Sequence, residues 1–108
     1  MTQPAPTVTA HSQPVLPVLL ATMHPREVDA LGAQLHTRAA TGLATYGVPL
    51  CTHNGRNSLN DWLDEALDGC AYGAQLWMER NYSAKVMRCL SLQIELAEAI
   101  KELAEEQA

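Results

Sequence analysis

Acidic side chains gather in the stretch from residue 57 to residue 70, which has the periodicity of an amphipathic helix. Asp61, Glu65 and Asp68 follow one another at spacings of four and three residues, so their carboxylates lie along one helical face. Like charges at such spacings cost about 0.2–0.5 kcal/mol per pair when nothing neutralises them. The face indicates either a Mg²⁺ site, because this ion binds one or two carboxylates together with water and phosphates, or a solvated surface.

A donor-rich loop precedes this helix and contains His53, Asn54, Arg56 and Asn57. Backbone N–H groups at a helix N-terminus carry partial positive charge and commonly hold phosphate. Arg56 has the geometry to clamp a phosphate with two hydrogen bonds. Next to the acidic face, the loop predicts a site for a Mg²⁺–nucleotide complex, and a polar surface loop is the alternative. Tyr46 lies at the start of this region as a candidate for base stacking or as a core residue.

Other metal and redox chemistries receive less support from the sequence. Cys51, Cys70 and Cys89 form no CxxC pair and the four histidines have no HxxxH spacing, which argues against a zinc site. An odd number of scattered cysteines fits a reduced compartment. Glu27 and Asp29 open a predicted helix and suit its dipole, although Glu27 is also a candidate for a further metal ligand.

Charge and hydropathy limit the partners and the location. The net charge of −5 argues against a protein that coats a nucleic-acid polymer. No apolar run approaches 18 residues, so we expect no transmembrane helix and no membrane partner. The N-terminus lacks the basic segment of a secretory signal, and we therefore expect a cytoplasmic protein.

The composition predicts an all-α domain. Hydrophobic residues make up 47 % of the chain without any Phe, and the abundant Leu and Ala favour helices. We expect three main helices, at about residues 25–46, 59–81 and 84–106. Gly47 is a natural residue to end the first helix and Ser58 to cap the second. A short break is expected at residues 81–83, and one continuous helix through them is the alternative.

The N-terminal segment and the last helix are each expected to pack against a further partner. Residues 1–24 form a Pro-rich arm, partly disordered or docked on the helical domain of residues 25–108, because five of the six prolines lie in residues 1–25. Within the arm, residues 15–20 (VLPVLL) are expected to dock in extended form, on their own domain or on a neighbouring subunit.

The last helix is apolar on two sides, which predicts two packing partners. One side holds Val86, Leu90, Ile94 and Ala97, and the other holds Leu92, Leu96, Ala99 and Leu103. In so short a chain the simplest second partner is another subunit, so we expect oligomerisation to complete the helical bundle.

The middle of the chain resembles the MazG-like all-α nucleoside triphosphate pyrophosphohydrolases, particularly small phage-type proteins. The resemblance covers about residues 26 to 82. It rests on the pattern Arg38-x3-Gly42-x3-Tyr46-Gly47, on the loop Asn54-Gly55-Arg56, and on an ExxD motif at Glu65 and Asp68.

The resemblance implies an oligomeric helical bundle that uses Mg²⁺ to hydrolyse NTPs or dNTPs to the monophosphate and pyrophosphate. Glu65 and Asp68 would then be catalytic, with Asp61 as a further metal ligand, and Arg38 would join the nucleotide-binding residues. The EExxE segment of the family is not found before Glu65.

Three functions therefore follow as expectations: Mg²⁺-dependent hydrolysis, binding and sequestration of a nucleotide signal without cleavage, or structural assembly. A phage-encoded protein would act in the host cytoplasm.

Overall fold

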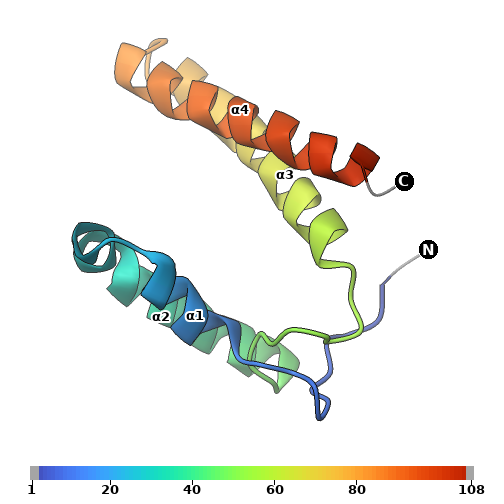
Figure 1. Cartoon of the computed structure of the whole chain (residues 1–108). Coiled ribbons are helices and arrows are strands. Elements are labelled where there is room, and N and C mark those ends of the chain that lie inside the picture. Colours follow the sequence, from blue (N-terminus) through green and yellow to red (C-terminus); the bar gives the residue numbers. More distant parts are fainter. Residues whose placement is uncertain (1–2, 107–108) are drawn as a thin grey trace. The chain divides into compact units, whose positions relative to one another are not determined.

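A computed structural model describes residues 3–106, and these residues form four α-helices and no strand (Figure 1). The predicted all-α class is therefore confirmed, with one helix more than the three main helices expected. The chain divides into two compact units, one ending at Arg56 and the other beginning at Asn57. In the described part of the chain, none of the helices has the length and apolar character needed to cross a membrane.

The first unit contains α1 (Val15–Thr22) and α2 (Pro25–Tyr46), which contact each other. The expectation that residues 15–20 are extended is wrong, because they form most of α1. Pro17 is compatible with this helix because it stands in the first turn, where a backbone N–H has no partner inside the helix. The apolar run VLPVLL thus packs on α2 as a helix rather than as a strand.

Local hydrogen bonds define both ends of α2. The His24 side chain accepts the N–H of Arg26 at 3.1 Å, and the Glu27 carboxylate accepts the N–H of His24 at 2.8 Å. Glu27 therefore acts as a capping residue, in keeping with its predicted place at the helix start. At the other end Gly47 has a φ of 75°, the left-handed conformation that glycine adopts without strain.

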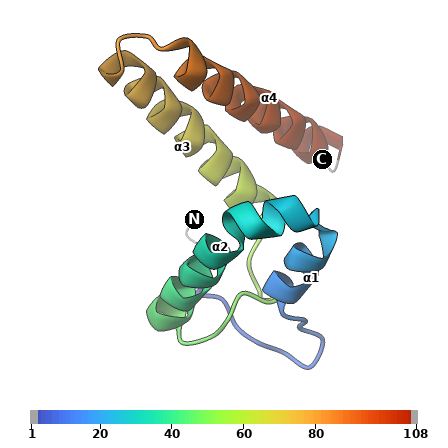
Figure 2. The ribbon, with the colours of Figure 1, turned by 90° about the vertical axis from the view of Figure 1, so that its left-hand side faces the viewer.

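The second unit is a helical hairpin of α3 (Ser58–Glu79) and α4 (Ala84–Glu106), which run antiparallel (Figure 2). The break between them is confirmed: Asn81 and Tyr82 both have positive φ, at 53° and 59°, so one continuous helix is excluded. The predicted cap at Ser58 is wrong by one residue. The side chain of Asn57 accepts the N–H of Asn60 at 3.0 Å and so caps α3.

Small residues bring the two helices of the hairpin close together. A Cβ added to Gly73 would lie 3.0 Å from Cδ1 of Leu90. One turn away, the amide of Gln93 crosses from α4 and donates to the carbonyl oxygen of Ala66 at 3.0 Å. Around these contacts lies a small apolar core, formed by Ala66, Ala97 and Ile100 with Leu59, Leu63 and Cys70 packed against it.

Each helix of the hairpin buries one stripe and leaves other apolar side chains exposed. Trp62 and Leu67, two large apolar residues of α3, are 51 % and 52 % exposed. Ile94, expected beside Leu90, is 50 % exposed. Two helices share only one contact line, so a broad apolar face cannot be buried by a single neighbour.

We predict opposite effects for substitutions at two glycines. Gly73→Val places methyl groups against Leu90 and should lower the free energy of unfolding by about 1–3 kcal/mol. In Gly42→Ala the new Cβ meets nothing within 4 Å, so helix propensity should raise stability by about 0.5–1 kcal/mol. Thermal unfolding followed by circular dichroism measures both. Equal melting temperatures for Gly73→Val and wild type would show that α3 and α4 do not approach closely at Gly73.

Candidate functional site

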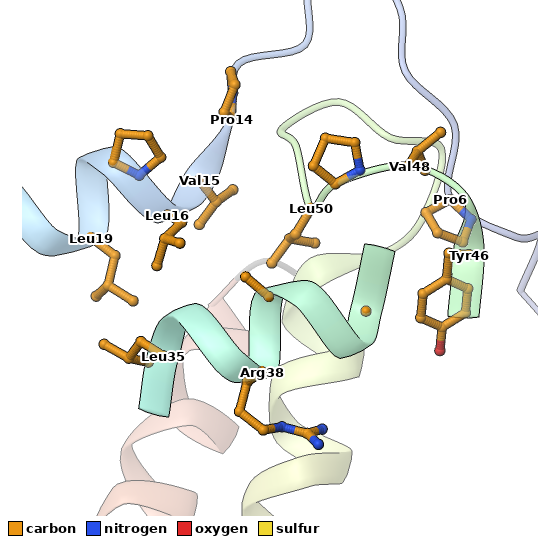
Figure 3. Close-up of a pocket in the computed structure, with 14 residues that line it drawn as sticks. Pro6, Pro14, Val15, Leu16, Leu19, Leu35, Arg38, Tyr46, Val48 and Leu50 are labelled. Carbon is orange, nitrogen blue, oxygen red and sulfur yellow. The ribbon is translucent and has the colours of Figure 1, made fainter. Parts of the chain in front are cut away.

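The first unit contains an apolar cavity of about 480 Å³ (Figure 3). Its walls come from the arm, from α1, from α2 and from residues 48–50, which follow α2. Arg38 is the one charged side chain among the lining residues of this cavity. The residues that line it are Pro6, Pro14, Val15, Leu16, Pro17, Leu19, Leu35, Arg38, Ala39, Gly42, Tyr46, Val48, Pro49 and Leu50.

Small side chains on α2 leave the space open. Ala39 and Gly42 lie on the α2 wall, and a Cβ built on Gly42 meets no atom within 4 Å. Leu16 and Leu19 form the opposite wall from α1 (Figure 3). At the rim Leu50 is 67 % exposed, so the cavity is open to solvent.

Two of the predicted nucleotide-binding residues, Arg38 and Tyr46, line this cavity. With Gly42 they follow one another at intervals of four residues, which places all three on one side of α2. The guanidinium of Arg38 extends away from the apolar side chains of α1 in Figure 3. The Tyr46 ring is 60 % exposed. The cavity thus combines an apolar space with one cation beside it, an arrangement suited to a ligand with a flat apolar part and an anionic part.

The other predicted phosphate-binding residues hold the N-terminal arm. The guanidinium of Arg56 donates to the carbonyl oxygen of Pro4 at 2.7 Å. The carbonyl oxygen of Asn54 accepts the N–H of Thr7 at 2.9 Å, and that of His53 accepts the Ser12 hydroxyl at 3.5 Å. The loop therefore binds polypeptide in this structure, in the region where the sequence predicts an anion.

Two asparagine side chains in the same region complete local turns. Oδ1 of Asn54 accepts the N–H of Arg56 at 3.1 Å, which closes the turn around Gly55, whose φ is 84°. Oδ1 of Asn57 caps α3, as described above. His53 has a φ of 52°, and its Nδ1 lies 3.1 Å from the Thr52 hydroxyl. These residues hold the shape of the loop.

The arm continues along the loop toward α1 through paired backbone bonds. The N–H of Thr52 donates to the carbonyl oxygen of Gln13 at 2.9 Å, and the N–H of Val15 donates to that of Leu50 at 3.1 Å. They flank an isolated antiparallel bridge between Pro14 and Cys51, where Cys51 is buried. This docking forms the arm's part of the cavity wall. The sequence signal for it was the apolar run that follows Pro14.

The predicted metal ligands Asp61, Glu65 and Asp68 lie on α3, in the second unit. Glu65 and Asp68 are exposed, and Asp61 is half-buried. Within residues 3–106, no three His, Cys, Asp or Glu side chains lie close enough to hold one ion. The carboxylates of α3 therefore suit Mg²⁺ binding of one kind, in which one or two carboxylates bind the ion and water or phosphates complete its coordination shell. Glu65 and Asp68, one turn apart, are the pair spaced for that mode.

No protein-family model matches this chain, and no curated protein or solved structure matches it. The residues that could hold a ligand lie in two separate places, the cavity of the first unit and the carboxylates of α3 in the second.

We predict that Asn57 acts as a helix cap. Asn57→Ala should lower the free energy of unfolding by about 1 kcal/mol, since the N–H of Asn60 loses its acceptor. Asn57→Asp should keep wild-type stability, because aspartate caps equally well and suits the helix dipole. Thermal unfolding by circular dichroism compares the two variants. If Asn57→Asp unfolds as easily as Asn57→Ala, capping does not explain the residue.

Proposed function

We propose that this protein binds a nucleotide in the cavity of its first unit. The observation that supports this proposal is the placement of Arg38, Gly42 and Tyr46 along one wall of an otherwise apolar cavity. These are the residues of the Arg38-x3-Gly42-x3-Tyr46 pattern, so the sequence motif and the cavity coincide. The base would occupy the apolar space, and the phosphates would lie at Arg38.

The dimensions and chemistry of the cavity support a ligand of this class. Small-molecule sites commonly have volumes of about 300–1,000 Å³, with apolar walls and few polar groups. The cavity of about 480 Å³ falls in this range. A guanidinium makes two parallel, charge-assisted hydrogen bonds to a phosphate, about twice as strong as neutral ones. The exposed Tyr46 ring offers a surface for stacking.

Hydrolysis of the nucleotide is the second candidate function, and the spacing of the α3 carboxylates favours it. Glu65 and Asp68, with Asp61 on the same face, would hold Mg²⁺ through their carboxylate oxygens. When bound, the ion supplies Lewis-acid stabilisation of the charge on the phosphates. The products would be a nucleoside monophosphate and pyrophosphate. On this proposal the protein is related to the MazG-like pyrophosphohydrolases and acts in the cytoplasm.

Sequestration of a nucleotide without cleavage and structural assembly are the alternatives to hydrolysis. A protein that binds a nucleotide or cyclic nucleotide without cleaving it would sequester a signal, which requires the cavity and Arg38 but no metal. A structural assembly module would require neither. Binding and product analysis therefore separate all three.

We predict that a panel of NTPs, dNTPs and cyclic nucleotides contains a ligand that raises the melting temperature of the protein. At a ligand concentration of 100 Kd the stabilisation is about 2.7 kcal/mol. Arg38→Ala should weaken binding by about tenfold to a hundredfold, because a charge-assisted hydrogen bond contributes about 1.5–3 kcal/mol. Arg26→Ala is the matched control, since Arg26 is an exposed arginine of α2 that does not line the cavity.

A second variant tests the cavity without removing charge. Gly42→Leu fills the space beside α2, where a Cβ meets no neighbour, and should abolish binding while the protein remains at least as stable as wild type. Isothermal titration gives the affinity and circular dichroism the stability. Unchanged affinity in Gly42→Leu would exclude the cavity as the nucleotide site. A response to alkyl carboxylates but to no nucleotide would identify a different amphipathic ligand.

We predict that the protein supplied with Mg²⁺ hydrolyses a bound NTP or dNTP with one water molecule to the monophosphate and pyrophosphate, and that Glu65→Gln and Asp68→Asn each reduce the hydrolysis rate at least about a hundredfold. Glu98→Gln removes an exposed acid from α4 and should have no effect. Chromatography of the products after incubation with and without Mg²⁺ measures the rate. Recovery of intact nucleotide from a tight complex would establish sequestration instead of hydrolysis.

A further inference from the structure

Helix α4 carries a second line of apolar residues that α3 does not cover. We call this line the outer seam; it consists of Cys89, Leu92, Leu96, Ala99 and Leu103. Its members follow at spacings of three, four, three and four residues. That is the heptad spacing with which one helix packs along another. Leu92, Leu96 and Leu103 are 56 %, 40 % and 43 % exposed, respectively.

The first line of α4 has the same spacing and is already occupied. Leu90, Gln93, Ala97 and Ile100 follow at intervals of three, four and three residues. Leu90, Ala97 and Ile100 are buried, and Gln93 donates to α3. One helix with two heptad seams is built for two helical neighbours, and the hairpin provides one of them.

The exposed apolar surface continues from α4 onto α3. Gly69 lies against Gln93, which is adjacent in sequence to Leu92 of the outer seam. Trp62 and Leu76 stand seven residues before and after Gly69, so they share its face of α3. They are 51 % and 40 % exposed. Exposed apolar side chains therefore lie on both helices of the hairpin, beside the outer seam on α4 and on the Gly69 face of α3.

The charges of α4 specify which partner fits and in which direction. Lys85 and Arg88 lie in its first half, which holds no acid before Glu95. Its second half holds Glu98, Glu102, Glu105 and Glu106 against one base, Lys101, which pairs with Glu105 at 3.8 Å within the helix. A second α4 running antiparallel sets the basic half of each helix against the acidic half of the other. A parallel copy would place like charges together.

We infer that the protein forms a symmetric dimer in which the outer seams of two hairpins pack antiparallel. The second copy supplies the apolar neighbour that the heptad spacing requires, and its charges are complementary to those of the first. Such an interface is isologous: the same residues serve on both sides of a two-fold axis. The result is a four-helix bundle formed by two copies of the second unit, independent of any nucleotide in the first.

Sedimentation analysis of the full chain tests this inference. Wild type should have twice the chain mass of 11.8 kDa, and Leu92→Glu and Leu96→Glu should have the mass of one chain, because each buries a carboxylate in the seam. Ile94→Glu is the matched control: Ile94 is 50 % exposed on the same helix but lies off the seam, so this variant should remain dimeric. Circular dichroism confirms that each variant is helical. A monomeric wild type, or a dimer that survives Leu96→Glu, would overturn the proposal.

The direction of pairing has its own test. Lys85→Glu combined with Arg88→Glu replaces attraction by repulsion in the antiparallel dimer and should raise its dissociation constant by about tenfold or more. In a parallel dimer like charges face each other before and after the double substitution, so the dissociation constant should change little. An unchanged dissociation constant would therefore exclude antiparallel pairing. So would an efficient Cys89–Cys89 crosslink in the wild-type dimer, because antiparallel pairing separates these residues.

Discussion

The close packing of α3 on α4 is the interaction on which the second unit depends. It is possible because Gly73 has no side chain at the point where Leu90 approaches, and because Gln93 satisfies its amide on the carbonyl oxygen of Ala66. One contact line between two helices buries one stripe of each. The remaining apolar residues of the hairpin, the outer seam among them, are left at the surface. The proposal of a further helical partner thus follows from how this pair packs.

The first unit depends on a different interaction, the docking of the arm along residues 50–56. Backbone hydrogen bonds hold the arm in place and lead it into α1: the N–H groups of Thr7 and Val15 donate to residues 54 and 50, and the carbonyl oxygen of Gln13 accepts from Thr52. The arm and α1 then form the wall of the cavity opposite α2. Side chains that suggest phosphate binding in the sequence, above all Arg56, contribute to this docking. The nucleotide site is therefore proposed in the cavity, where Arg38 provides the positive charge, and not in the loop where the sequence predicts it.

The two units carry separate parts of the proposed chemistry. The cavity with Arg38 beside it, where nucleotide binding is proposed, belongs entirely to the first unit. The carboxylates of α3 belong to the second unit, which is also where the dimer interface is proposed. A binder that does not cleave its ligand requires only the first of these features. The proposed hydrolysis would use the carboxylates as well.

The sequence by itself determined the features that depend on near neighbours in the chain. Helix periodicity located α2, α3 and α4, and the left-handed preference of glycine placed the end of α2 at Gly47. Repeated intervals of four residues put Arg38 and Tyr46 on one face. Each of these follows from interactions within a few residues, so local spacing was enough to predict it.

Only the tertiary structure decided which of several permitted partners each group takes. The run VLPVLL is a helix because α2 offers it a packing surface, and Pro17 falls where its missing N–H has no consequence. Arg56 binds the carbonyl oxygen of Pro4, a residue 52 positions away, and no local pattern contains that information. The same holds for Trp62, whose exposure depends on the contact line between α3 and α4. Interactions between distant residues are fixed by the way whole elements pack, and a spacing pattern leaves that packing open.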